Sequence, residues 1–404
     1  MGYNQAMVDE VFELIKQEEK RQGETLQMIP SENYASRKVR EAEGSVLMNK
    51  YSEGYPGKRY YQGNKIIDEI ENLAVERAKK LFNIEFVNVQ PYSGSPANAA
   101  VLMALVEPGE KIMGLKLSGG GHLTHGHPKV TFSGKFYQSV QFDVNSEGWI
   151  DYDEAEKLAR AEKPKLLLIG TTAYPRILDW EKWRKIADGA GAYLVADISH
   201  IAGLVVGGAH PSPVGFADVV TTTTHKTLRG PRGAMVMTND AELVKKIDKA
   251  VFPGLQGGPH DNTTAAIAIA LAEAAKSEFG DYARQIVKNA KVLSEELIRL
   301  GCKLTTGGTD NHLMVIDLGG GGKEAAIKLE EAGIVVNYNT VPHDINPPAN
   351  PSGIRLGTPA ITTRGMREGE MRLVASWIDK VIKGGGRTKI AGEVRKLCKK
   401  FPVP

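Results

Sequence analysis

Apolar positions change their spacing along the chain, and each spacing predicts a kind of element. Within Asn64–Phe82 they recur every three or four residues, the period of a helix with one buried face. Between about residue 165 and residue 250, short runs of apolar or β-branched residues alternate with helical stretches. The runs are Lys165–Gly170, Tyr193–Asp197 and Val219–Thr223, and a clear helix among them is Asp179–Ala190, ended by Gly191. Continuous apolar strands separated by helices indicate a mostly parallel sheet covered on both faces.

The pattern changes after the alanine-rich stretch Ala265–Ala275, which predicts a buried helix. A long charged amphipathic helix comes next, at Asp281–Leu300, and shorter elements follow it. We place strands at Leu313–Leu318 and Ile334–Asn337, and helices at Lys323–Ala332 and Met366–Ile382. The sequence therefore predicts a polar N-terminal arm at 1–63, a large α/β domain at 64–278 and a smaller α+β domain at 279–404.

Composition narrows the class of protein. Of the 404 residues, 42% are hydrophobic and 25% charged, and the net charge is +3, which gives no reason to expect a nucleic-acid partner. The longest apolar stretch is too short for a membrane span, and the first seven residues lack the apolar core of a secretory signal. Two cysteines, Cys302 and Cys398, argue against a disulfide framework. We expect a soluble, cytoplasmic protein that does not bind a membrane.

The run Thr221–Gly233 is the strongest pointer to chemistry. Its β-branched strand ends at His225 and Lys226, and two arginines and three turn-forming residues follow. Burial and neighbouring cations favour the neutral amine of a lysine, the form that makes Schiff bases with carbonyl compounds. The alternative is a solvated basic turn, which a single lysine cannot exclude.

Two further groups are expected to contact the same ligand as Lys226. Asp197 also ends an apolar strand, and ligands of open α/β sheets sit at the carboxyl ends of strands. An aspartate beside a pyridine nitrogen keeps it protonated, whereas the alternative role is a simple cap or turn. Ser93–Asn98 precedes an apolar helix, with Ser95 as expected N-cap and Pro96 as first helical residue. Free backbone N–H groups there would bind a phosphate, unless the serines only cap the helix.

Three other features have both a functional and a structural interpretation. Arg355 lies in a short strand between glycines and could clamp a carboxylate, or form a surface salt bridge. The histidines at 122, 125 and 127 match no zinc signature, so we favour an imidazole stacked on a planar ligand and expect no metal. Gly319–Lys323 lacks the spacing of a phosphate-binding loop and predicts a turn.

Taken together, these segments resemble the serine hydroxymethyltransferase family, whose members depend on pyridoxal 5'-phosphate (PLP) and have the aspartate-aminotransferase fold, type I. The resemblance covers nearly the whole chain. The segments that carry it are Ser31–Tyr34, Lys50–Tyr61, Gln90–Ser95, Gly120–His125, Asp197–Gly203, Thr221–Gly233, Val251–Pro259, Gly307–Leu313 and Ser352–Ala360. It implies an α/β fold with a mixed, mostly parallel seven-stranded sheet in the large PLP-binding domain and a smaller C-terminal α+β domain.

The resemblance also implies roles for individual residues. Lys226 would hold PLP, Asp197 would pair with its ring nitrogen, and His122 would stack on the ring. Thr172 and His200 would lie near the phenolic oxygen, and Arg355 and Ser31 would bind the substrate carboxylate. The remaining residues implied for the cofactor pocket are Ser93, Gly94, Ser95, His225, Arg232, Tyr51, Gln256 and Gly257.

Some of these residues are implied to come from a second subunit. Tyr51, Glu53 and Tyr61, with Gln256 and Gly257, would reach into the partner's site, so the arm would contact the partner in a homodimer, possibly a tetramer, with shared sites. Glu53 would handle the proton on the serine hydroxyl and on the folate. The tetrahydrofolate site would be lined by Glu53, Tyr60, Leu117, Gly121, Leu123 and Asn339.

The implied reaction converts L-serine and tetrahydrofolate to glycine and 5,10-methylenetetrahydrofolate, through an external aldimine and a quinonoid on PLP. Small departures from the family pattern occur at Pro96, Thr172, Ser199 and Ala234. Two alternatives stay open: a folate-independent aldolase or transaldolase acting on threonine or another β-hydroxy amino acid, and a non-catalytic or nucleotide-binding module of the same fold.

Overall fold

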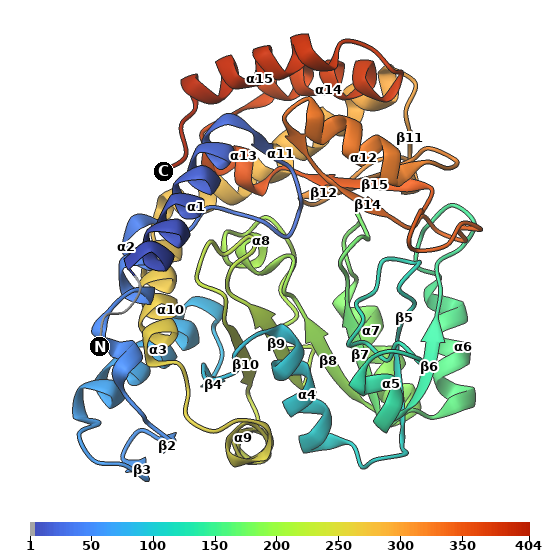
Figure 1. Ribbon diagram of the computed structural model, residues 1–404. Coiled ribbons are helices and arrows are strands. Elements are labelled where there is room, and N and C mark those ends of the chain that lie inside the picture. The colour runs from blue at the N-terminus through green and yellow to red at the C-terminus, as the bar shows by residue number, and fades with distance from the viewer. Residues whose placement is uncertain (1–4) are drawn as a thin grey trace.

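The computed structural model describes residues 5–404; the first four, part of the segment expected to lack a secretory signal, lie outside it. Its centre is a seven-stranded sheet in the order β4-β10-β9-β8-β7-β5-β6 (Figure 1). Only β10 runs against its neighbours. The strands are β4 (Phe86–Asn88), β5 (Lys111–Leu115), β6 (Gln138–Phe142), β7 (Leu166–Gly170), β8 (Tyr193–Asp197), β9 (Val219–Thr223) and β10 (Ala234–Thr238). The expected mixed, mostly parallel sheet is confirmed.

Helices cover both faces of this sheet because its strands alternate between two apolar cores. On β7, Leu167 and Ile169 pack into one core, while Leu166 and Leu168 pack into the other. The larger core is closed by α3 (Lys65–Phe82), α6 (Tyr152–Glu162), α7 (Trp180–Ala190), α10 (Asp261–Ala274) and the first half of α11 (Ser277–Arg299). The smaller is closed by α4 (Gly94–Leu105) and α9 (Ala241–Lys249), with α5 (Phe132–Phe136) at its edge.

Local signals set the ends of these helices. The side chain of Asp179 accepts a hydrogen bond from the Lys182 N–H and so caps α7, and Gly191 ends α7 in the left-handed conformation at φ 68°. Asn83 ends α3 in the same conformation, at φ 52°. These caps account for the agreement between predicted and observed bounds in this part of the chain.

A second layer of the molecule is built on a four-stranded sheet in the order β11-β12-β15-β14 (Figure 1). Its strands are β11 (Lys303–Leu304), β12 (Leu313–Asp317), β14 (Asn337–Asn339) and β15 (Gly353–Gly357). The helices around it are the second half of α11, α12 (Gly322–Glu331), α13 (Pro359–Thr363), α14 (Glu368–Ile382) and α15 (Arg387–Lys400). The α11 helix supplies side chains to both cores, and the division of the chain at residue 278 stays a prediction.

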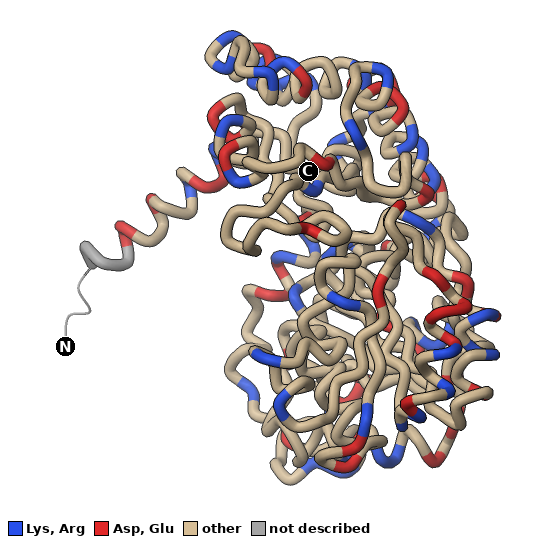
Figure 2. Tube along the Cα trace, turned by 90° about the vertical axis from the view of Figure 1, so that its right-hand side faces the viewer, with Lys and Arg blue, Asp and Glu red and all other residues tan. Residues whose placement is uncertain are grey.

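The N-terminal segment belongs to both layers. Helix α1 (Gln5–Glu24) projects from the body (Figure 2), and β1 (Leu26–Gln27) pairs with β13 (Ile334–Val335). Leu26 and Met28 are buried in the core of the second layer. The remaining elements are α2 (Arg37–Glu43), β2 (Gly54–Tyr55), β3 (Lys58–Arg59), α8 (Ala202–Val206) and short turns of helix at Val46–Asn49, Ala250–Leu255 and Thr305–Gly307. Within residues 5–404, no helix is both long and apolar enough to cross a membrane.

Two sequence predictions of element bounds were wrong, and one helix was not predicted. Helix α4 begins at Gly94 with Ser93 as N-cap, and not at Pro96, because the chain turns early where Gly94 packs against Thr223. The predicted strand at 334–337 is two strands, since β13 pairs with β1 and β14 pairs with β15. Helix α15 had no predicted counterpart.

Candidate active site

A cavity of about 470 Å³ lies at the carboxyl ends of β7, β8 and β9, where Arg355 of β15 faces the large sheet. This is the edge at which open α/β sheets bind ligands. The residues that line the cavity are Ser31, Glu32, Ser93, Gly94, Ser95, Leu117, His122, Leu123, His125, Thr171, Thr172, Asp197, Ser199, His200, Thr223, His225, Lys226, Arg232 and Arg355.

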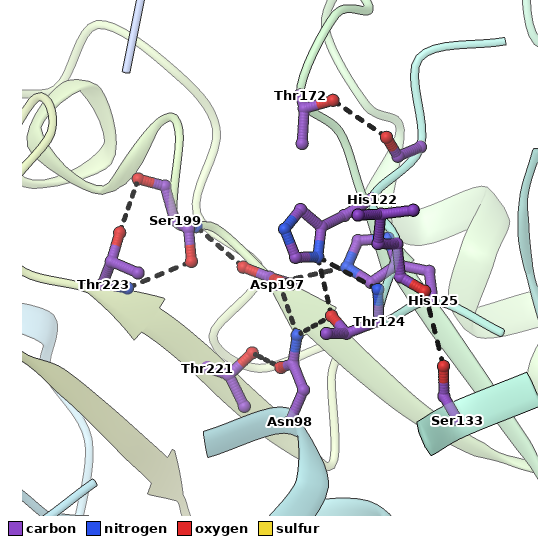
Figure 3. A network of polar contacts seen from close by, with 12 residues as sticks. Asn98, His122, Thr124, His125, Ser133, Thr172, Asp197, Ser199, Thr221 and Thr223 are labelled. Atoms are coloured by element: carbon purple, nitrogen blue, oxygen red, sulfur yellow. Dashed lines mark hydrogen bonds and ion pairs between the residues drawn. The ribbon is translucent and has the colours of Figure 1, made fainter. Parts of the chain in front are cut away.

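Asp197, the last residue of β8, is held as an anion by three neighbours (Figure 3). Its Oδ2 accepts from Asn98 Nδ2 at 2.8 Å and lies 3.0 Å from His125 Nε2, and its Oδ1 accepts from the Ser199 N–H. Burial alone would raise the pKa of Asp197, but these donors hold that pKa well below its usual range. Asp197 is therefore more than a cap, since a fixed carboxylate faces the cavity.

Lys226 lies three residues beyond the end of β9 and lines the same cavity. Burial, with the nearby charges of Arg355 and Arg232, lowers its pKa from 10.5 to about 8 against the opposing effect of Asp197. A hydrogen bond holds its backbone in place, because the Lys226 carbonyl accepts from Asn33 Nδ2 at 2.9 Å. The geometry excludes the solvated basic turn and leaves an amine that deprotonates near neutral pH.

Arg355 is a buried cation without an anion. In β15, its Nη1 donates to the Thr172 carbonyl at 2.5 Å, and its Nε donates to Asn337 Oδ1 at 3.0 Å. Burial lowers its pKa to about 10. Within residues 5–404 it forms no salt bridge, which excludes the surface ion pair as its role. A buried guanidinium with one edge on the cavity is suited to a carboxylate brought by a ligand.

The N-terminus of α4 opens on the cavity. Ser93, Gly94 and Ser95 line it, and the Ser93 side chain makes no capping hydrogen bond. A side chain at position 94 would clash, because an added Cβ would lie 2.7 Å from Thr223 Cγ2. The first backbone N–H groups of a twelve-residue helix thus remain available to an anion, which favours the phosphate interpretation over simple capping.

Three histidines of the cavity, His122, His200 and His225, are neutral. Burial lowers the pKa of His122 to about 4 and that of His225 to about 3, and the pKa of His200 also lies well below its usual range. His122 Nδ1 lies 2.7 Å from Thr124 Oγ1, which fixes one ring nitrogen and leaves the ring at the cavity wall. Among residues 5–404, no group of three metal-ligating side chains was found.

Eight residues implied by the resemblance do not line this cavity: Tyr51, Glu53, Tyr60, Tyr61, Gly121, Gln256, Gly257 and Asn339. Tyr51 and Glu53 instead form a separate group, with Tyr51 Oη 3.2 Å from Glu53 Oε1 and the Tyr61 ring edge-on to Tyr51 at 5.1 Å. Gln256 is bonded to Gln90 and Tyr92, and Gly257 lies beside Glu53. Within one protomer, Glu53 therefore does not line the cavity of Lys226.

Two residues that support the site were missed by the sequence interpretation. Asn98 lies one turn into α4, where its amide bridges Asp197 to Thr221 and Thr124. The sequence interpretation of the histidines at 122, 125 and 127 was a metal site or a stacked imidazole, whereas His125 is almost fully buried and holds Asp197. The one available signal was a polar residue, Asn98, inside an otherwise apolar helix.

The chain is similar to known proteins over nearly its whole length. The family model described as serine hydroxymethyltransferase matches residues 5–378. The chain belongs to the serine hydroxymethyltransferase family. It is 57% identical to the serine hydroxymethyltransferase of Acidothermus cellulolyticus, over 98% of this chain and 95% of that protein. It is 56% identical to the proteins of the same name from Desulfotalea psychrophila and Sorangium cellulosum, with 98% of this chain covered in each case and 94% and 95% of theirs.

Membership in this family makes the fold a type I fold and PLP the expected cofactor. The residues present fit that group. One cavity, large enough for a small ligand, is lined by four suitable groups. They are the guanidinium of Arg355, unpaired with a carboxylate within residues 5–404, the anionic carboxylate of Asp197, the N-terminus of α4 and the amine of Lys226 with its lowered pKa.

Proposed function

We propose that the protein catalyses the reversible conversion of L-serine and tetrahydrofolate to glycine and 5,10-methylenetetrahydrofolate, as a transferase that uses PLP. The observation that carries this proposal is the pairing of Lys226 and Arg355 across one cavity. One is an amine whose pKa is lowered to about 8, and the other is a buried guanidinium that lacks a carboxylate within residues 5–404. An amino-acid substrate supplies that carboxylate.

Each residue has a definite task in this proposal. Lys226 would hold the cofactor through its neutral amine, and the backbone of Ser93–Ser95 would hold its phosphate. His225 and Arg232 would complete the pocket. Asp197, anionic at any working pH, retains a proton on the ring nitrogen, so that bound PLP can accept electrons from the bond being broken. His122, at the cavity wall, would cover the ring, and Thr172 and His200 would be the groups near its phenolic oxygen.

The substrate is oriented by a second group of residues. Arg355 binds its carboxylate in a bidentate way, and Ser31 at the cavity wall adds a hydroxyl. The Thr172 carbonyl and Asn337 fix the plane of the Arg355 guanidinium before the substrate arrives. Such preorganisation turns binding energy into alignment of the bond that must break.

We further propose that the active form is a homodimer with shared sites, possibly paired into a tetramer. Helix α1 leaves large apolar side chains exposed in the single protomer, including Phe12 at 58% and Leu14 at 62%. Tyr60, at 74%, and Tyr61 are also exposed, next to Glu53. A second copy would bury these faces and carry Tyr51, Glu53, Tyr61, Gln256 and Gly257 to the neighbouring lysine cavity.

Glu53 is then the group that moves the proton on the serine hydroxyl and on the folate. Leu117 and Leu123 at the cavity wall, with Tyr60, Gly121 and Asn339, make up the proposed folate site. In this protomer Gly121 also has a packing role, since an added Cβ would lie 2.0 Å from the Leu115 carbonyl oxygen. The two free cysteines are compatible with the reducing cytoplasm, where we place the reaction.

One assay tests the function. Purified protein loaded with PLP is given L-serine, and glycine is measured with and without tetrahydrofolate. We expect folate to accelerate glycine formation strongly, and we expect Lys226→Ala to fold but not to turn over serine. Equal rates without folate would favour the β-hydroxy amino acid aldolase, and failure to bind PLP would favour a non-catalytic module.

A further inference from the structure

Two buried histidines from different layers of the molecule form a pair at the wall of the cavity. His200 follows β8, and His312 directly precedes β12 of the small sheet. His200 Nδ1 lies 3.1 Å from His312 Nε2, and the ring centroids are 5.4 Å apart. His200 is 3% exposed and His312 is fully buried. His312 does not line the cavity.

The pair can hold its protons in two ways. Both rings are neutral, since burial and the charges of Lys226 and Arg355 lower the pKa of each, to about 3 for His312. Each neutral ring carries one N–H, and one ring must donate to the other across the 3.1 Å contact. Either His312 donates from Nε2, or His200 donates from Nδ1.

The second ring nitrogen of His312, Nδ1, distinguishes the two arrangements. Its Nδ1 is buried and has no hydrogen-bond partner within residues 5–404. If His200 were the donor, Nδ1 of His312 would carry a buried N–H with nothing to accept it, which folded proteins rarely tolerate. If His312 is the donor, Nδ1 is only a lone pair, and the unsatisfied group is an acceptor.

We propose that His312 is a positioning residue that donates its Nε2–H to His200 and thereby fixes the proton of His200 on Nε2, as a donor toward the cavity. His200 lines the cavity, and its Nε2 bonds to no other residue in the described chain. A fixed donor there suits a ligand oxygen that carries negative charge, such as the phenolic oxygen of PLP. That last consequence rests on the proposed function, whereas the placement of the proton does not.

The arrangement also ties His200 to the position of the small sheet. Next to His312, Asn311 Nδ2 donates to the Tyr174 carbonyl at 3.1 Å, and the Asp310 N–H donates to the Pro175 carbonyl at 2.8 Å. The strand that follows His312 pairs with β15, which carries Arg355. The same docked sheet thus presents the carboxylate clamp and fixes the proton of His200.

The test begins with the cofactor-free protein, labelled with ¹⁵N at its histidines. Long-range ¹H–¹⁵N spectra should show His200 as a single tautomer, with a protonated Nε2 and a bare Nδ1. His312→Leu, which removes the donor, should give His200 a mixture of tautomers. His210→Leu is the matched control, because His210 is also buried but bonds only to the Pro211 carbonyl; it should leave His200 unchanged.

The catalytic arm compares His312→Leu with His312→Gln, whose amide can restore the donor. In the loaded enzyme, kcat for serine should fall about tenfold in the leucine variant, the size of one lost hydrogen bond, with KM nearly constant, and glutamine should recover most of it. A wild-type His200 protonated on Nδ1, or equal losses in both variants, would overturn the proposal. If the wild type lacks serine turnover, the proposed function fails while the tautomer result still stands.

Discussion

Lys226 and Arg355 share a physical problem, because each is a cation withdrawn from water without a carboxylate bonded to it. Within residues 5–404 neither forms a salt bridge, and burial lowers the pKa of both. For Lys226 the result is a neutral amine at moderate pH, and for Arg355 it is an unmet demand for an anion. The free-energy cost of burying the two groups would thus be offset by the ligand that both would bind.

The lowered pKa of Lys226 gives a prediction on pH. Since only the neutral amine attacks a carbonyl, the rate at which cofactor-free protein binds PLP should rise with pH and reach half its limit near pH 8, well below the ordinary 10.5. Arg355→Gln removes a charge that lowers this pKa, so its midpoint should lie higher. Rapid-mixing absorbance measures both, and a midpoint near 10 in the wild type would contradict the expectation.

At the scale of elements, local sequence signals predicted three of the seven strands of the large sheet, β7, β8 and β9, and several of the helices around it. Asp179 and Gly191 mark both ends of α7, and apolar runs mark β7 and β8. The wrong predictions fall where contacts between residues distant in sequence determine the bounds of an element. Helix α4 starts at Gly94 because of packing against Thr223, and β13 separates from β14 because β1, more than 300 residues earlier in the chain, pairs with it. Periodicity within a short window does not contain that information.

One such distant contact joins the two ends of the chain. Arg364, which follows α13 and is only 5% exposed, donates to the Phe401 carbonyl at 2.6 Å and the Cys398 carbonyl at 3.0 Å at the end of α15. It also donates to the Thr25 carbonyl at 2.8 Å, just beyond α1. A cation placed at two helix C-termini satisfies carbonyls that no backbone N–H can reach.

Arg364→Ala should therefore destabilise the protein by roughly 2–4 kcal/mol, because several buried carbonyls lose a charged donor. We expect a lower denaturant midpoint and earlier proteolysis at both termini, with Arg364→Lys intermediate. Arg372→Ala is the control, since Arg372 is exposed on α14. Equal midpoints for Arg364→Ala and Arg372→Ala would show that the two helix ends do not depend on Arg364.

At the scale of the whole molecule, the sequence and the resemblance identified most of the residues that line the lysine cavity, whereas the supporting residues behind it had to come from the structure. Lys226, Asp197 and Arg355 stand at strand ends or between glycines, where a pattern exposes them. Asn98, His125 and His312 act through contacts with residues 72 to 112 positions away in sequence. In the single protomer Glu53 does not line the lysine cavity. Whether the Glu53 of a second subunit completes that cavity therefore depends on how the subunits assemble.

Mixed dimers answer that question. We expect Lys226→Ala and Glu53→Gln each to be inactive for serine cleavage. If they are unfolded together and refolded as an equal mixture, half of the dimers should be mixed, and each mixed dimer regains one site with an intact lysine and an intact glutamate. The mixture should recover about a quarter of wild-type activity.

The matched control places both substitutions in one chain and mixes it equally with wild type. Shared sites leave both sites of a mixed dimer defective, so only wild-type dimers act and about a quarter of the activity remains. Separate sites would leave about half, because every wild-type protomer would work whatever its partner. No recovery in the first mixture, together with half in the second, would mean that Glu53 serves the lysine of its own chain, and the protomer would then have to rearrange to bring the two together.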